Sequence, residues 1–197
     1  PCVIGLITSD EETGGTYGTG EFVKQLAGHT KLAIILDGPR TDKLAITTKQ
    51  KGGVHIELTA RGTSAHASRP WLGVNAIEVL ITALGKIKML IGKAKANTWQ
   101  STYNTGVIST DNRAANVIPK NARAIIDIRF TEKLARRPEQ LVRTIQKLLP
   151  HISVQIRTAI PLMKTDERDP FIQSYRRIAS KITGVDVPFV FGHGASD

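Results

Sequence analysis

Three adjacent carboxylates near the start of the chain could carry out metal chemistry. Asp10, Glu11 and Glu12 follow an apolar run at residues 3–8 and precede a glycine-rich segment. The run predicts a buried strand, and α/β enzymes place their active sites at the carboxyl ends of such strands. Packing like charges together costs free energy unless a cation or a shared proton offsets it. The acids therefore favour a metal site, and the alternative is a helix start, where carboxylates complement backbone N–H groups.

The elements that must position such a site are clearest in the middle of the chain. Residues 54–61 alternate apolar and polar side chains, with His55 and Glu57 on the polar face, which predicts a half-buried strand. Apolar residues recur at helical spacing over residues 77–91. Further elements are expected as strands over residues 99–108, 122–130 and 152–156 and as a helix over residues 138–148. This β-α-β-β-α-β order matches the ferredoxin-like sandwich, in which two helices cover one sheet face.

The flanking segments carry elements of a different kind of domain. Strands are expected over residues 2–8 and 187–191, and helices over residues 21–27 and 171–182. We therefore expect an α/β fold with three parts: residues 1–47 and 162–197 form one α/β domain, interrupted by a ferredoxin-like domain at residues 48–161.

The formal charge of +10 raises the question of a nucleic-acid partner. The basic residues are scattered over several predicted helices with few aromatic residues between them, which is typical of solvated helix faces. We therefore expect no nucleic-acid partner. A basic nucleic-acid binder with a ferredoxin-like fold remains the alternative.

The sequence also bears on the compartment. The longest apolar stretch, residues 77–91, is interrupted by Lys86 and Lys88 and falls short of a membrane span, so we expect no membrane partner. No signal peptide is visible and the lone Cys2 cannot form an internal disulfide, which favours a cytoplasmic location. The chain opens without Met and stops in a loop, so we expect it to be a piece of a longer protein.

Four separated motifs span nearly the whole chain. In order they comprise residues 9–12, residues 62–70 with 73–77, residues 116–119 with 127–129, and residues 192–197. Together they resemble the di-zinc metallopeptidase and amidohydrolase family that includes succinyl-diaminopimelate desuccinylase, acetylornithine deacetylase and glutamate carboxypeptidase. The resemblance implies a parent enzyme that hydrolyses an amide or peptide bond in a small N-acyl amino acid or peptide. It also implies a homodimer formed through the ferredoxin-like lid domain.

The resemblance assigns roles to the acids. Glu11 corresponds to the general base and Glu12 to a zinc ligand of a site that holds two zinc ions, with Co or Mn as alternatives. Bound zinc lowers the pKa of its water, and a neighbouring carboxylate can take the proton. Asp37, after a predicted strand at residues 32–36, corresponds to the next ligand. An Asp-Gly turn is the alternative there.

Lid residues are implied to contact the substrate. In family dimers the residue matching His66 reaches the partner's active site and stabilises the developing oxyanion. Asn116 resembles a second lid contact. Arg129 resembles the guanidinium that holds a substrate carboxylate, so the expected substrate is a small molecule or short peptide carrying a carboxylate. A cross-strand ion pair is the alternative for Arg129.

The last motif resembles a loop that lines the substrate pocket. Gly194 and Ser196 are its implied binding residues, and His193 is not expected to be a metal ligand. A nucleophile elbow with Ser196 as nucleophile is the alternative, which the family's Gly-Ser-Asp loop at this place disfavours.

The family's metal site also uses an upstream His-x-Asp pair, a bridging Asp and a downstream His. This sequence has none of these motifs. Two carboxylates alone cannot build a di-zinc site, because zinc sites depend on ligand number and geometry. We therefore expect this chain alone to bind no zinc and to be inactive. A dimerisation or binding module that kept the fold and lost the site is the alternative.

Overall fold

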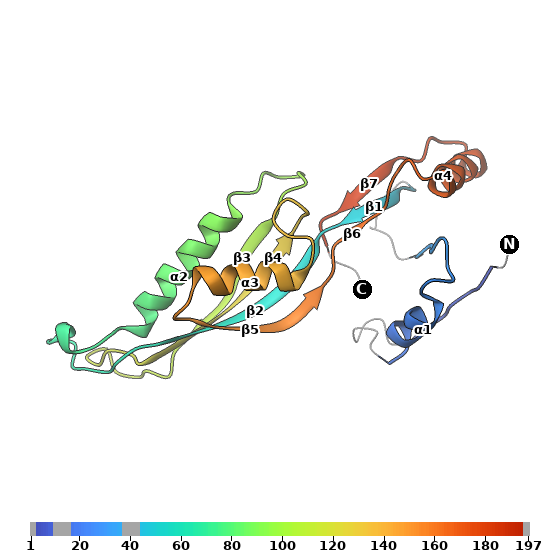
Figure 1. Ribbon diagram of the computed structural model, residues 1–197. Helices are drawn as coiled ribbons and strands as arrows, with labels where there is room; N and C mark the ends of the chain where they lie inside the picture. Colours follow the sequence, from blue (N-terminus) through green and yellow to red (C-terminus); the bar gives the residue numbers. More distant parts are fainter. Residues whose placement is uncertain (1–2, 10–16, 37–43, 195–197) are drawn as a thin grey trace. The chain divides into compact units, whose positions relative to one another are not determined.

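The central part of the chain folds into a four-stranded antiparallel sheet covered on one face by two helices (Figure 1). The strands are ordered β3-β4-β2-β5 across the sheet. In chain order the elements are β2 (Gly52–Arg61), α2 (Ala76–Ile91), β3 (Thr102–Ser109), β4 (Asn121–Phe130), α3 (Pro138–Leu148) and β5 (Ser153–Ile160). The predicted β-α-β-β-α-β order and the ferredoxin-like sandwich are thus confirmed.

The core lies between the sheet and the helix layer. Ile56 and Leu58 of β2 are fully buried, as are Leu80 of α2 and Ile145 of α3. Strand alternation turns every second residue of β2 and β4 toward the helices, so the opposite sheet face carries polar side chains. The helices divide that layer, because α2 packs on β2, β4 and β3, whereas α3 packs on β5 and β2.

Local signals fix where the two helices begin. The side-chain oxygen of Asn75 accepts a hydrogen bond of 3.0 Å from the backbone N–H of Ile77 and caps α2. Pro138 occupies the first turn of α3, where its missing N–H costs nothing.

The structure describes residues 3–9, 17–36 and 44–194, which divide into two units. One unit contains Thr48–Thr165 and the described residues from Phe191 onward, and the other contains Asp166–Val190 and the described residues up to Thr47. The assignment of the flanking segments to one α/β domain stays a prediction.

Outside the four-stranded sheet, the described residues form a second, smaller sheet and further helices. A three-stranded sheet has the order β6-β1-β7, from Met163–Lys164, Ile46–Gln50 and Phe189–Gly192. The sequence did not predict β1 or β6. The flanking helices are α1 (Thr19–Leu26) and α4 (Pro170–Thr183), and a short 3-10 helix, η2, spans Pro70–Leu72. The side chain of Asp169 caps α4, and Gly184 ends it with a left-handed φ of 72°.

The two strands expected to lead into the acidic residues are absent, so those predictions are wrong. Residues 3–8 and 32–36 have no strand structure, and Ile7 and Leu36 are 97% and 92% exposed. Neither segment pairs with another strand in the described part of the chain, and apolar sequence without a hydrogen-bonded neighbour does not make a strand. No helix among the described residues is long and apolar enough to cross a membrane.

Candidate active-site residues of the lid

The candidate acids of the metal site, Glu11, Glu12 and Asp37, lie outside the described residues. Ser196, a candidate substrate contact, also lies outside them. Among the residues that are described, no group of three or more His, Cys, Asp and Glu side chains is arranged to hold a metal ion. The candidate residues within the described part of the chain are those of the lid, His66, Asn116 and Arg129, and Gly194, which lies in a bend after β7.

The structure brings His66 and Asn116 together from segments that are far apart in sequence. The backbone N–H of Ala67 donates a hydrogen bond of 2.8 Å to the carbonyl of Asn116, and His66 forms an isolated bridge with Val117. Both candidate side chains are exposed. Two loops thus present an imidazole and an amide from one end of the ferredoxin-like unit.

The His66 ring is held by its own turn. The backbone N–H of Ser68 donates to Nδ1 at 3.2 Å, and the Ser68 hydroxyl lies 2.7 Å from the same nitrogen. Because Nδ1 accepts the backbone hydrogen bond, the proton of the neutral ring sits on Nε2. Nε2–H is therefore the group that His66 can offer to a developing oxyanion.

Close backbone contacts explain the two glycines that flank this turn. Thr63 and Val74 exchange two backbone hydrogen bonds of 2.9 Å each. A Cβ on Gly62 would overlap the Val74 carbonyl, and one on Gly73 would lie 2.7 Å from the Thr63 carbonyl. The motif needs glycine at both positions because a side chain would open the loop that carries His66.

Arg129 is paired on its own strand. Its Nε and Nη2 donate to the two carboxylate oxygens of Asp127 at 2.8 and 3.0 Å, and Nε2 of His55 on β2 lies 3.2 Å from Asp127 Oδ2. Burial alone raises the pKa of the Asp127 carboxyl, but the hydrogen bonds and charge of Arg129, with those of His55, hold that pKa below its ordinary value. The pair leaves Nη1 of Arg129 unused, so a carboxylate-binding role stays a prediction.

A second charged cluster on the same sheet face was missed by sequence reasoning. Glu57, 7% exposed, accepts from Arg157 Nε at 2.9 Å and from Arg157 Nη2, and Arg123 lies 3.5 Å away. The alternation of β2 had already placed His55 and Glu57 on one face. Their partners on β4 and β5 required the strand register, which the sequence did not supply.

The loops of His66 and Asn116 lie near the start of β4, whereas Arg129 lies near its end. Residues 62 and 120 are joined by a 2.8 Å backbone hydrogen bond, which fixes the His66 and Asn116 loops at the start of β4. Arg129 lies eight residues after Asn121, a distance of about 27 Å along an extended strand. One small substrate therefore cannot contact Arg129 and the two loop residues of the same chain.

The central unit is an open-faced ferredoxin-like sandwich that carries an exposed histidine loop at one end. Residues 48–157 match the family model M20_dimer, described as the peptidase dimerisation domain. The match covers more than half of the chain, so the chain belongs to this family of M20 peptidase domains. The resemblance seen in the sequence motifs is thereby confirmed.

Relatives and solved structures agree with this assignment. The succinyl-diaminopimelate desuccinylase of Orientia tsutsugamushi strain Boryong is 27% identical over 98% of this chain and 51% of its own length. That of Paracoccus denitrificans is 26% identical over 99% of this chain and 54% of its own. The chain therefore spans about half the length of these relatives.

Among solved structures, aminopeptidase PepT from Bacillus cereus ATCC 10987 has a TM-score of 0.71 and 21% identity, covering 96% of this chain and 50% of that protein. A tripeptidase from Staphylococcus aureus Mu50 has a TM-score of 0.58 and 19% identity, covering 77% of this chain and 40% of that protein. These likenesses show the fold.

Proposed function

We propose that the protein to which this chain belongs is a zinc-dependent hydrolase of an amide or peptide bond. Its substrate is a small N-acyl amino acid or short peptide that carries a carboxylate. The observation that carries this proposal is the dimerisation-domain match at residues 48–157, together with desuccinylase relatives that align over 98% and 99% of the chain.

The acids at the start of the chain supply part of the chemistry. Zinc, when bound, would lower the pKa of a water molecule toward neutrality. Glu12 and Asp37 would hold it, since carboxylate oxygens are accepted zinc ligands, and Glu11 would accept the proton of the attacking water. Two ligands are fewer than the three protein ligands of a typical catalytic zinc site, so the chain alone is inactive in this proposal.

The lid supplies binding and polarisation. Arg129, held in orientation by Asp127, binds the substrate carboxylate through Nη1. His66 donates from Nε2 to the carbonyl oxygen as it gains charge, with Asn116 beside it. Gly194 and Ser196 line the pocket. Because Arg129 and His66 lie at opposite ends of β4, they serve two different active sites of a homodimer.

Zinc binding tests this proposal directly. We expect calorimetric titration of the 197-residue chain to give a dissociation constant weaker than about 1 μM, because the ligand set is incomplete. The chain joined to upstream His-x-Asp and downstream His sequences should bind zinc more tightly and hydrolyse an N-acyl amino acid, and a chelator should abolish that hydrolysis.

Two results would contradict this account. Submicromolar zinc binding by the chain alone would show that the missing ligands are not needed. A zinc-loaded, complete protein without hydrolytic activity would favour the non-catalytic dimerisation module instead.

The proposed homodimer forms along the edge made by β3 and α2. β3 is an edge strand on which Val107 and Ile108 are 43% and 56% exposed. On α2, Ile81 and Met89 are 57% and 77% exposed. Gly85 lies between them at helical spacing, with open space where a Cβ would be, so a second helix could approach closely. An unpaired strand edge beside an apolar helix stripe favours pairing with a second copy.

Charged substitutions on this stripe should separate the subunits. We expect Ile81→Glu with Met89→Glu to raise the dimer dissociation constant by at least about 100-fold, since both place a charge in a desolvated interface. Sedimentation equilibrium measures the change. Ile182→Glu, at a 79% exposed position of α4, is the matched control and should leave the dimer intact. A dimer that survives the double substitution would exclude this edge.

A further inference from the structure

Positive charge is concentrated in the ferredoxin-like unit. Residues 48–165 hold 19 of the 27 Lys and Arg residues but 6 of the 17 Asp and Glu residues, a net charge of +13, whereas the rest of the chain has a net charge of −3. The excess charge of the whole chain therefore belongs to this unit.

The basic residues have different surroundings on the two faces of the unit. On the sheet face, Arg123 and Arg157 lie against Glu57, and Arg129 lies against Asp127. The outer side of α3 and the turn before it carry exposed cations, which we name the α3 basic surface: Lys133, Arg136, Arg137, Arg143 and Lys147. Across the described residues none of their side chains makes an ion pair within 4.0 Å, not even with the nearby Glu139.

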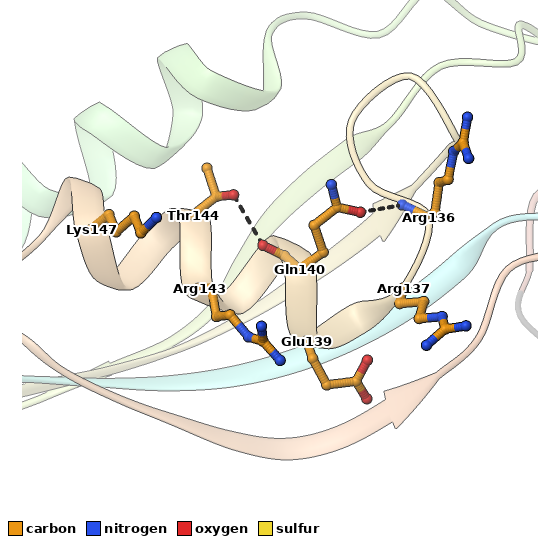
Figure 2. A pocket seen from close by; sticks show the side chains of 7 residues that line it. All are labelled: Arg136, Arg137, Glu139, Gln140, Arg143, Thr144 and Lys147. Atoms are coloured by element: carbon orange, nitrogen blue, oxygen red, sulfur yellow. Dashed lines mark hydrogen bonds between the residues drawn. The ribbon is translucent and has the colours of Figure 1, made fainter.

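The α3 basic surface borders a shallow hollow. Four of its cations line the hollow together with Glu139, Gln140 and Thr144, and Figure 2 shows these side chains projecting from α3 and from the turn before it. Gln140 and Thr144 are themselves hydrogen-bonding groups set between the cations. Arg, Lys, Gln and Thr are the side chains that contact phosphate oxygens in nucleic-acid complexes.

The spacing of the cations favours an extended ligand. Arg137, the N-cap of α3, and Lys147 are separated by ten residues, about 15 Å along a helix, which exceeds the reach of one phosphate group. A duplex presents a phosphate about every 1.7 Å of its axis, counting both strands, and so can engage all of these cations.

Two other polyanions fit the surface less well. None of the exposed large apolar side chains among the described residues lies on α3, so the surface has nothing to insert into a lipid bilayer. The hollow is lined by no aromatic residue on which unpaired bases could stack, which disfavours single strands. α3 also packs on the β5 half of the sheet, so dimerisation along β3 and α2 would leave it free.

We propose that the α3 basic surface binds the phosphate backbone of a duplex nucleic acid without reading its bases. This differs from the expectation drawn from the sequence, in which the basic residues appeared to be scattered and no nucleic-acid partner was expected. Within the described residues, the structure pairs the arginines of the sheet face with acids and leaves the α3 cations without an ion pair. The proposal does not depend on the hydrolase function.

A salt titration with a labelled duplex of about 20 base pairs tests it. With four phosphate contacts, the logarithm of the binding constant should fall with the logarithm of salt concentration at a slope of about −3.6. Arg143→Gln with Lys147→Gln should reduce the slope to about −1.8 and weaken binding at least tenfold at 0.1 M salt. Lys86→Gln with Lys88→Gln removes the same charge from α2 and is the matched control, expected to weaken binding less than threefold. Thermal unfolding should be unchanged in both variants.

Three outcomes would overturn the proposal. The first is no duplex binding at 50 mM salt, and the second is equal losses in the α3 and α2 variants, which would mean a diffuse field rather than a surface. The third is stronger binding to phosphatidylserine vesicles than to the duplex, with the same dependence on Arg143 and Lys147, which would assign the surface to a membrane.

Discussion

Replacing Glu11 by Gln in the complete protein is expected to lower kcat about a thousandfold while leaving the zinc content unchanged. The reason is that an amide cannot accept the proton of the attacking water, and general-base catalysis contributes about 10² to 10⁴ in rate. Gln has nearly the same size as Glu, so the substitution should not disturb the neighbouring ligand Glu12. Steady-state kinetics and metal analysis of the same preparation measure both quantities.

The neighbouring acid provides the contrast. Glu12→Ala should lower zinc content as well as activity, because it removes a ligand rather than a base. Equal loss of metal in the two variants would mean that both residues are ligands, and the assigned roles would be wrong. Unchanged activity in Glu11→Gln would remove the general base from the mechanism.

His66→Ala is expected to lower kcat about 10² to 10³-fold, the usual cost of removing one oxyanion donor. The stronger result should come from mixing. If His66 acts in the partner's site, a mixed dimer of His66→Ala and Glu11→Gln subunits contains one site with both residues intact and one with neither. Equal mixing then places about half of the subunits in mixed dimers and restores about a quarter of the wild-type activity.

The mixing experiment has its own control. Two preparations of the same variant, mixed in the same way, should regain nothing. Subunit exchange has to be verified with differently tagged chains. If mixed dimers form and activity does not return, His66 acts in its own subunit, and the 27 Å estimate for β4 would then count against Arg129 as the carboxylate contact of that site.

The ferredoxin-like part could be predicted because its signals are local. The alternation of residues 54–61 and the helical spacing of residues 77–91 each mark one apolar face. Each element has to bury that face, so its type can be predicted from the pattern alone. The flanking strands could not be predicted in this way. Residues 3–8 and 32–36 are as apolar as a buried strand, but a strand also needs hydrogen-bonded neighbours, and pairing is not encoded in the segment itself.

The candidate site was also only partly predictable from the sequence. Sequence motifs were enough to name His66, Asn116 and Arg129, and the family match supports the resemblance from which those names came. Sequence did not show that the His66 and Asn116 loops are joined by backbone hydrogen bonds, or that Arg129 is held by Asp127 and lies at the far end of β4.

The amino-acid sequence by itself determined the order of the central elements and the family, and it predicts which acids handle zinc and water. Only the tertiary structure decided which charges neutralise one another: Glu57 and Asp127 hold the arginines of the sheet face, whereas the cations of α3 form no ion pair within the described part of the chain. The physical reason is that hydrophobic periodicity is a property of neighbouring residues, whereas an ion pair depends on strand register and on side chains separated by up to 100 positions in the chain.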